Sequence, residues 1–314
     1  MSKRIAFLFS GQGAQTVGMG RDLCARFPVA AELFKQADEI LQRPLSRIAF
    51  DGPEDELTQT KNCQPALYVH GLACLAVLRQ ELGDFAVQAV AGLSLGEFTA
   101  HAAAGTFDFE TGLRIVAQRG QFMQDACEQT EGAMAAMIGA EENVVRDLAA
   151  ETDVDIANIN SPGQIVISGE AAKVALAVAL AGEKGIRRSM PLKVAGAYHS
   201  RLMKSAYIRL ADVLQATPLR TPGFKVVCNV DAQPVSDADA IRESLREQVT
   251  GSVLWARSME YLIDHEKCEQ FIELGPGKVL AGLLNRTRKG TPIVSITDVP
   301  SLEAAVAELR PILT

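Results

Sequence analysis

The sequence is poor in the residues that mark a metal centre, a disulfide framework or a membrane span. Its 314 residues include six cysteines and four histidines, and no Cys-x-x-Cys pair or His/Cys cluster has the spacing of a zinc site. No apolar run reaches the roughly 18 residues of a membrane helix. The first residues, Met1-Ser2-Lys3-Arg4, lead straight into an apolar segment, so we expect no signal peptide. These absences predict a cytoplasmic protein with free thiols, no metal and no membrane contact.

Charge and hydrophobicity set further limits. The formal net charge of −7 argues against a nucleic-acid partner. With 48% hydrophobic residues, the chain can bury one large core or two domains. Strands expected near 5–9, 86–91, 226–230 and 269–274 alternate with helical patterns, which is typical of a parallel α/β sheet. The acidic stretch 231–239 reads as a loop.

A different pattern interrupts this alternation between residues 131 and 195. The expected elements are a strand over 133–138, a helix over 141–151, strands over 154–159 and 165–168, a helix over 171–184 and a strand over 188–194. This βαββαβ order is ferredoxin-like. We therefore expect a small subdomain over 131–195, inserted into a large α/β subdomain made of 1–130 and 196–314. A site would lie in the cleft between the two.

The most informative motif is Gly92-Leu93-Ser94-Leu95-Gly96, which reads Gly-x-Ser-x-Gly. It lies where an apolar run gives way to a helical pattern, as a nucleophile elbow requires. Glycines two positions on either side allow close backbone approach, and the helix N-terminus can receive negative charge. Ser94-x-x-Glu97 also matches a capping box. On this motif alone, a nucleophile and a simple helix cap both remain open.

A serine nucleophile needs a base, and the histidines offer one candidate by elimination. His101 follows Ser94 by seven positions on the same expected helix, roughly 10 Å along its axis. His70 lies within a mostly apolar helix and reads as packing, while His265 lies among charged residues. His199 follows a strand-like segment and a glycine and precedes an expected helix. The alternative is that His199 only caps that helix.

Glycines 11, 13, 18 and 20 follow the first expected strand. Their spacing fails both the dinucleotide-binding and the Walker patterns, because Thr16 and Met19 stand where glycine and lysine are needed. A loop after the first strand can instead donate a backbone N–H to an oxyanion hole.

Seven motifs in order carry a family resemblance. They are Phe9-Ser10-Gly11-Gln12-Gly13-Ala14-Gln15, Gln64-Pro65-Ala66-Leu67, Gly92-Leu93-Ser94-Leu95-Gly96-Glu97, Gln118-Arg119-Gly120-Gln121-Phe122-Met123-Gln124, Asn160-Ser161-Pro162-Gly163-Gln164, Ala197-Tyr198-His199-Ser200 and Glu273-Leu274-Gly275-Pro276-Gly277-Lys278-Val279-Leu280. Together they resemble the malonyl-CoA:acyl-carrier-protein transacylases of fatty acid synthesis, of which the acyltransferase domains of polyketide synthases are close relatives. The resemblance covers residues 4 to about 284 and implies an α/β-hydrolase-like large subdomain.

The resemblance implies the catalytic roles. Ser94 would accept the acyl group, and His199 would act as general base and acid. The backbone N–H groups of Gln12 and Leu95 would form the oxyanion hole. In this family a backbone carbonyl orients the histidine, and here it would fall near Leu254.

The resemblance also implies which residues bind the malonyl group. Arg119 would hold the malonyl carboxylate through two parallel hydrogen bonds, and Gln64 and Asn160 would line the site. A surface arginine is the alternative for Arg119, although its apolar neighbours favour partial burial. Tyr198 stands where malonyl-specific members often carry Phe, so its ring should still crowd an α-methyl branch. Leu93 replaces a commoner His, with little expected loss.

The implied activity is transfer of malonyl from malonyl-CoA to the phosphopantetheine thiol of an acyl carrier protein, with no permanently bound cofactor. A serine acyl-thioester hydrolase on the same elbow is the alternative enzyme, and a non-catalytic scaffold is the alternative class. We expect a monomer. Tolerance for methylmalonyl, and the choice between fatty acid and polyketide synthesis, stay open.

Carrier proteins are generally acidic, so an acidic enzyme needs local basic stretches to receive one. Two are present: Lys184, Arg187, Arg188 and Lys193 form the first, and Arg286, Arg288 and Lys289 form the second. Either would receive the carrier or the phosphates of CoA, and ordinary solvated charge is the alternative.

Overall fold

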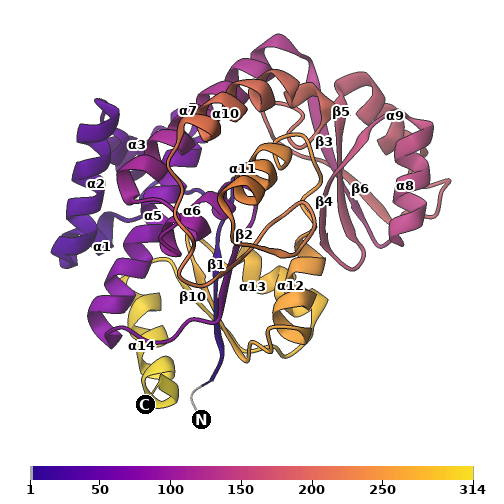
Figure 1. The fold of residues 1–314 in the computed structure, drawn as a ribbon. Helices are drawn as coiled ribbons and strands as arrows, with labels where there is room; N and C mark the ends of the chain where they lie inside the picture. The colour runs from indigo at the N-terminus through magenta and orange to yellow at the C-terminus, as the bar shows by residue number, and fades with distance from the viewer. Residues whose placement is uncertain (1–2, 314) are drawn as a thin grey trace.

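The computed structural model describes residues 3–313, and within them the strands form two sheets (Figure 1). The larger sheet has the order β10-β9-β1-β2-β7-β8, and the smaller has the order β4-β5-β3-β6. Neighbours in the larger sheet are parallel except for β7 and β8. Neighbours in the smaller sheet are antiparallel. The expected α/β class with a parallel sheet is confirmed.

The elements of the larger body come from both ends of the chain. Its strands are β1 (Ile5–Phe9), β2 (Ala89–Gly92), β7 (Lys225–Val227), β8 (Pro234–Val235), β9 (Gln270–Leu274) and β10 (Ile293–Ile296). The helices before the insertion are α1 (Arg21–Arg26), α2 (Pro28–Leu41), α3 (Leu45–Asp51), α4 (Glu54–Thr58), α5 (Thr60–Leu82), α6 (Leu95–Ala103) and α7 (Phe109–Gln129). Those after it are η1 (Arg201–Met203), α10 (Lys204–Ala216), α11 (Ala238–Glu247), α12 (Trp255–Asp264), α13 (Val279–Thr287) and α14 (Val299–Leu313).

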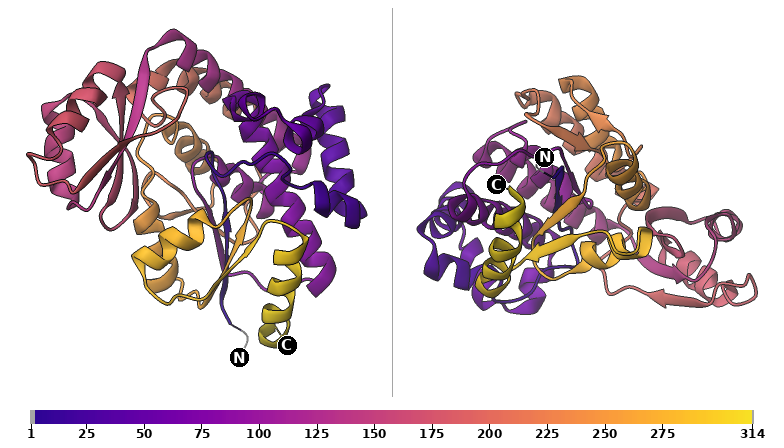
Figure 2. Two further views of the ribbon diagram at one scale, coloured as in Figure 1. Left: turned by 180° about the vertical axis from the view of Figure 1, so that it is seen from behind. Right: turned by 90° about the horizontal axis from the view of Figure 1, so that it is seen from below.

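The smaller sheet forms a lobe at one end of the molecule, away from both termini (Figure 2). Its elements are β3 (Gly132–Ile138), α8 (Glu142–Glu151), β4 (Asp155–Ser161), β5 (Gln164–Glu170), α9 (Ala171–Leu180) and β6 (Arg188–Pro191). Met137 and Ala135 of β3 pack against α8 and α9, whereas Met134 and Ala136 on its other face join the main core. The lobe therefore turns one sheet face toward the larger body.

Alternation along the central strand explains why the larger sheet is buried on both sides. Phe7 and Phe9 of β1 belong to one core cluster, and Ala6 and Leu8 belong to another. All four side chains are buried, as expected for a parallel strand covered by helices on both faces.

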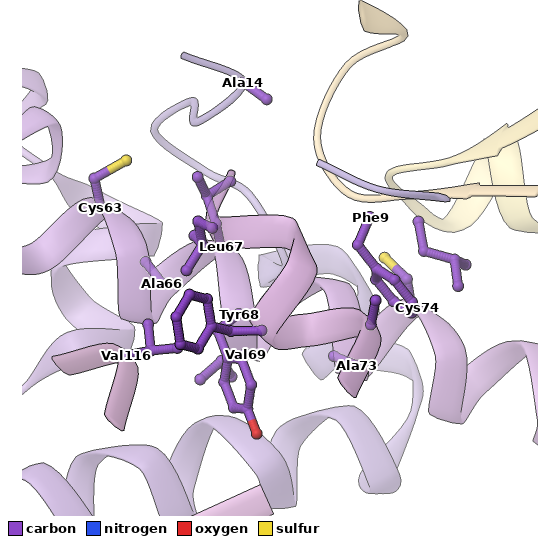
Figure 3. Packing of buried hydrophobic residues seen from close by; sticks show 14 of the residues in the cluster. Phe9, Ala14, Cys63, Ala66, Leu67, Tyr68, Val69, Ala73, Cys74 and Val116 are labelled. Atoms are coloured by element: carbon purple, nitrogen blue, oxygen red, sulfur yellow. The ribbon is translucent and has the colours of Figure 1, made fainter. Parts of the chain in front are cut away.

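Helix α5 ties the sheet to α7. Tyr68, Val69 and Cys74 of α5 share one buried cluster with Phe9 of β1 and Val116 of α7 (Figure 3). Because interiors are close-packed, this cluster fixes α7 relative to the carboxyl end of β1.

One local expectation is wrong. The stretch 231–239, expected as a loop, contains β8 and the start of α11. The left-handed Ala232 (φ 58°) lies in the connection 228–233 between β7 and β8, and the Asp237 side chain accepts a hydrogen bond from Ala240 N to cap α11. Short strands and side-chain caps of this kind leave little hydrophobic periodicity to detect.

Candidate active site

A cavity of about 240 Å³ lies between the two sheets, and residues from widely separated motifs line it. Six of the residues singled out from the sequence are among them: Gln12, Gln64, Ser94, Asn160, Tyr198 and His199. Arg119 and Leu95 are fully buried beside it, with no exposed surface. Of the sequence-predicted set, the structure leaves only Leu254 outside this group.

Ser94 stands on a strained turn between β2 and α6. Its backbone is left-handed at φ 53° and ψ −107°. A Cβ on Gly92 would lie 1.9 Å from the carbonyl carbon of Gly96, and one on Gly96 would lie 2.1 Å from Phe9 O, so both positions require glycine. The Ser94 side chain makes no cap hydrogen bond to α6. The capping-box alternative is therefore wrong, and the hydroxyl is left for other partners.

The imidazole of His199 lies against that hydroxyl. His199 Nε2 is 2.8 Å from Ser94 Oγ, and His199 Nδ1 is 2.8 Å from Gln248 O. A carbonyl oxygen can only accept, so Nδ1 carries the proton in the neutral ring and Nε2 is free to accept the serine proton. The alternative that His199 caps the following helix is wrong. The cap is Ser200, whose hydroxyl accepts from Leu202 N at the start of η1.

The residue that orients the histidine differs from the expected one. Leu254 was expected to supply the carbonyl, and the structure places Gln248 O there instead. Leu254 lies just before α12, and its carbonyl accepts from Ser258 N within that helix. Gln248 follows α11 directly, and position along the chain alone could not decide which turn would reach the imidazole.

Burial keeps the imidazole neutral. Desolvation, with the nearby Arg119 charge, lowers the pKa of His199 to about 4, against a weaker opposing effect of its backbone carbonyl partners. A neutral imidazole near pH 7 is the form that can take a proton.

Arg119 of α7 reaches the same serine from the other side. Its Nη2 donates to Ser94 Oγ at 3.3 Å and to Gln248 Oε1 at 2.8 Å, and its Nη1 donates to Gln64 Oε1 at 2.6 Å. The expectation of burial is confirmed, since the residue has no exposed surface. Burial lowers the pKa of Arg119 to about 10, so it stays a cation at neutral pH.

Two polar atoms near the cavity have no partner among the described residues. Arg119 Nε and Asn160 Oδ1 are both buried and make no hydrogen bond there. Buried polar groups are normally paired, and a buried cationic donor beside a cavity is suited to an anionic ligand.

The two backbone N–H groups expected to form an oxyanion hole have no acceptor among the described residues. Among the hydrogen bonds of residues 3–313, none is donated by the N–H of Gln12 or Leu95. Leu95 opens α6, whose first N–H groups lack helical acceptors. The Tyr198 hydroxyl is 2.5 Å from Thr60 Oγ1 and accepts from Gln12 Nε2 at 3.4 Å, so two residues hold that hydroxyl.

The other histidines lie away from the serine, as expected. His70 is buried in α5 with Nε2 3.1 Å from Thr297 O. His101 is buried, with Nδ1 3.0 Å from Thr106 Oγ1. His265 is exposed and stacks on Tyr261 at 5.1 Å between ring centroids.

Sequence reasoning missed three residues that hold the elbow. Asn229 Oδ1 accepts from Ser94 N at 2.7 Å, and Asn229 Nδ2 donates to Gly92 O at 2.8 Å. Gln248 Nε2 donates to Ser94 O at 2.9 Å and to Glu97 Oε2 at 2.6 Å. Glutamine and asparagine outside a motif carry no catalytic signal in one sequence. Glu97 could have been found, because a glutamate at the start of a buried helix needs partners.

No group of three or more His, Cys, Asp or Glu side chains among residues 3–313 is placed to hold a metal ion. The six cysteines are free thiols, as expected. Within the same residues, no helix has both the length and the apolar character needed to cross a bilayer.

Comparison with known proteins identifies the family. Residues 6–311 match the model of the acyl transferase domain, and the chain belongs to that family. It is 41% identical to the malonyl CoA-acyl carrier protein transacylase of Bacillus subtilis (strain 168), over 99% of this chain and 98% of that protein.

Solved structures agree with this assignment. The acyl-carrier-protein-S-malonyltransferase of Bartonella henselae superposes with a TM-score of 0.93 at 39% identity, covering 98% of this chain and 99% of that one. A type II PKS acyl-carrier protein in complex with its malonyl-transacylase includes a chain that superposes with a TM-score of 0.93 at 37% identity, covering 97% and 99%.

Proposed function

We infer that this chain transfers the malonyl group of malonyl-CoA to the phosphopantetheine thiol of an acyl carrier protein, through an ester on Ser94. The observation that carries the inference is the position of Ser94 Oγ, 2.8 Å from His199 Nε2 and 3.3 Å from Arg119 Nη2. A nucleophile, a base and a buried cation meet at one atom beside a cavity. Relatives over nearly the full length are named malonyl CoA-acyl carrier protein transacylases.

The first half-reaction forms the ester. His199 Nε2 takes the Ser94 proton as Oγ attacks the thioester carbonyl, and the proton passes to the sulfur of CoA as the C–S bond breaks. The N–H groups of Gln12 and Leu95 would stabilise the oxyanion of the tetrahedral intermediate. Removing one such donor in a known enzyme costs about 10²- to 10³-fold in rate.

The second half-reaction reverses these roles. The carrier thiol gives its proton to His199, its sulfur attacks the ester carbonyl, and Ser94 Oγ leaves with the proton from Nε2. The enzyme returns to its starting state without a cofactor. Because CoA leaves before the carrier thiol reacts with the ester, the expected kinetics are ping-pong.

Arg119 would select malonyl over acetyl. Its guanidinium is held rigidly by Gln64 and Gln248, and an unpartnered Nε adds a donor. A malonyl carboxylate can take two parallel hydrogen bonds from such a fork. Acetyl offers no carboxylate and leaves the buried cation without an anionic partner. Asn160 and Tyr198 would line the acyl pocket from the small sheet and from the loop before His199.

The two sheets support a division into two subdomains, 1–130 with 196–314 and 131–195. The strand order β4-β5-β3-β6 with antiparallel neighbours supports the ferredoxin-like interpretation of this βαββαβ unit. A parallel sheet with a serine on the turn after β2 is α/β-hydrolase-like. The cavity takes residues from both, as the cleft hypothesis requires.

The carrier would dock at the mouth of this cavity. Lys193, from the first basic stretch, lines the cavity and is exposed. Arg286, from the second, donates to Gln164, which also lines it. The half-exposed Val279 adds an apolar contact at the same place. Lys184 and Arg288 form ion pairs with Glu151 and Asp264. Lys193 and Arg286 at the mouth of the cavity are therefore the stronger candidates for binding the carrier.

Cellular context follows from the same residues. Six free thiols support a reducing, cytoplasmic compartment. The cavity is lined by residues of this chain on both sides, so the proposed mechanism needs no residue from a second copy. One relative is named a polyketide biosynthesis protein, and others are the transacylases reported above.

The deciding experiment follows labelled malonyl-CoA with and without holo carrier protein. We expect one malonyl group on Ser94 by peptide mass spectrometry, and rapid transfer to holo carrier but not to apo carrier, which lacks the thiol. Free malonate as the main product in both cases would instead show the hydrolase. An unlabelled enzyme would show the scaffold.

A further inference from the structure

Glu97 occupies a fully buried position directly behind the catalytic serine and has no part in the mechanism above. Its Oε2 accepts from Gln248 Nε2 at 2.6 Å and from Asn229 N at 3.1 Å. Its Oε1 accepts from Ser244 Oγ at 3.1 Å. The residue has no exposed surface. Burying an ionised carboxylate is costly unless it is hydrogen-bonded or paired, and the three donors around Glu97 meet that need.

Gln248 links Glu97 to both sides of the site. Its Oε1 accepts from Arg119 Nη2 at 2.8 Å, and its backbone oxygen lies 2.8 Å from His199 Nδ1. Its Nε2 donates to Glu97 Oε2 and to Ser94 O. One residue therefore presents an amide oxygen to the cation that would read the substrate and a backbone oxygen to the base.

The orientation of the Gln248 amide depends on Glu97. An ionised carboxylate can only accept, so the NH₂ end of Gln248 must face Glu97, and the oxygen end must then face Arg119. With the amide turned over, two donors would meet at Arg119 and two acceptors at Glu97. The carboxylate thus fixes which atom of Gln248 the guanidinium meets.

Of the two groups whose negative charge raises the pKa of Arg119, Glu97 has the larger effect. Its carboxylate opposes the lowering of the pKa of Arg119 by burial, more than the Tyr198 hydroxyl does. Arg119 has no direct ion pair among the described residues, because its partners are two glutamine oxygens and a serine hydroxyl. The charge balance of the resting site therefore passes through Gln248.

We propose that Glu97 is a positioning residue for malonyl selection, which holds the Gln248 amide toward Arg119 and balances the Arg119 charge between turnovers. This rests on the proposed function, since it concerns how Arg119 is set to read the malonyl carboxylate. Acetyl transfer needs Ser94 and His199 but no carboxylate reader. Loss of Glu97 therefore lowers malonyl transfer more than acetyl transfer.

The test compares Glu97→Gln with Glu273→Gln. Glu273 is a matched control, because it too has no exposed surface and accepts from two backbone N–H groups and a serine, Leu280 N, Ala281 N and Ser295 Oγ. Initial rates of Ser94 labelling give kcat/KM for malonyl-CoA and for acetyl-CoA at pH 8. We expect Glu97→Gln to lower the malonyl-to-acetyl ratio about tenfold and Glu273→Gln to leave the ratio unchanged.

Ser244→Ala provides a second variant that keeps the charge of Glu97 and removes one of its donors. We expect its ratio to fall about threefold, between wild type and Glu97→Gln. This variant decides the question if Glu97→Gln does not fold by circular dichroism. An unchanged ratio in both variants, or an equal fall in Glu273→Gln, overturns the proposal.

A pH series supplies a readout that a merely structural role would not move. Burial raises the pKa of Glu97 to about 7. The titratable groups that face it are Arg119 from α7 and the Cys228 thiol after β7, while α11 contributes only the Ser244 hydroxyl. The wild-type ratio should fall as the pH drops from 8 to 6 and approach that of Glu97→Gln, whose own ratio stays flat. A wild-type ratio that is independent of pH contradicts the charge-balance role.

The two inferences fail differently. Wild-type enzyme that takes no malonyl label on Ser94 contradicts the proposed function itself. Wild-type enzyme that labels normally while Glu97→Gln keeps full malonyl selectivity contradicts only the role of Glu97.

Discussion

Ser94 Oγ and His199 Nε2 lie 2.8 Å apart although 105 positions separate the two residues in the chain. Both have left-handed backbones, with φ of 53° for Ser94 and 56° for His199. Non-glycine residues pay for that conformation and keep it only where the surroundings enforce it. The strain therefore lies at both members of the proposed nucleophile–base pair, which is where preorganisation has its effect.

Replacing Ser94 by alanine removes the oxygen that is proposed to carry the ester. We expect no malonyl-enzyme by intact-protein mass spectrometry and no transfer to holo carrier. The fold should persist, because alanine has the same Cβ in the left-handed turn and Ser94 N keeps its bond to Asn229 Oδ1. The melting temperature by circular dichroism provides the control. Residual label on another residue would show that the nucleophile has been misassigned.

Arg119→Ala separates recognition of the carboxylate from chemistry. Hydrogen bonds to charged groups contribute roughly 1.5–3 kcal/mol each. Losing two predicts a fall of roughly 10²- to 10⁴-fold in kcat/KM for malonyl-CoA. Acetyl-CoA should lose far less or gain, because no buried cation is then left unpaired. Arg119→Lys, which keeps the charge without the fork, should fall between.

Steady-state labelling with both thioesters measures this difference. Equal losses on malonyl-CoA and acetyl-CoA would mean that Arg119 supports the elbow and does not read the carboxylate.

The elbow was predictable because its chemistry constrains neighbours in the sequence. Gly92 and Gly96 are required by contacts under 2.2 Å that any Cβ would make, and such constraints appear as a fixed spacing. His199 was reachable by elimination, since the chain has only four histidines.

Residues that act through backbone atoms or amides leave no such trace. The carbonyl that faces His199 belongs to Gln248 rather than Leu254, and any residue type has a carbonyl. Asn229, which holds Ser94 N, follows β7 without a motif. Which loop reaches the site is decided by tertiary packing, as it was for β8 and α11 in the expected loop 231–239.

Asn229→Ala tests the support of the elbow independently of recognition. The change removes the acceptor for Ser94 N and the donor to Gly92 O. Leaving a buried donor unpaired costs about 1–3 kcal/mol, so we expect a lower melting temperature and roughly 10- to 100-fold lower kcat. Both thioesters should lose equally, in contrast to Arg119→Ala. A selective loss of malonyl transfer would place Asn229 in recognition instead.

Charge reversal at the cavity mouth tests carrier docking. Lys193→Glu with Arg286→Glu should raise the KM for holo carrier about tenfold or more, because like charges across an interface slow association. Purified malonyl-enzyme isolates this second half-reaction from any effect on CoA. The matched pair Arg187→Glu with Arg188→Glu changes two exposed cations of the small lobe away from the cavity lining and should leave the KM nearly unchanged. The reverse result would move the docking surface to β6.

The buried histidines predict a specific acid sensitivity. Burial lowers the pKa of His101 to about 3 and that of His70 to about 4, from an ordinary value of 6.5. Since the unfolded state binds the proton first, each contributes stability that is fully present above pH 6.5 and is lost as the pH falls toward the folded-state value. The loss is about 1.4 kcal/mol per pH unit for each group.

Other buried groups change the stability with pH in the opposite direction. The contribution of one histidine must therefore be measured as the difference in stability between the wild type and a variant without it. Burial raises the pKa of Glu97 to about 7, and its protonation in the folded state favours folding between pH 7 and 4.5. His101→Leu isolates one histidine, because leucine cannot take the proton. Urea unfolding at pH 7, 6 and 5 should show the wild type losing stability relative to His101→Leu by about 1.4 kcal/mol per unit below pH 6.5. Parallel curves for wild type and His101→Leu would mean that His101 is not kept neutral by the fold.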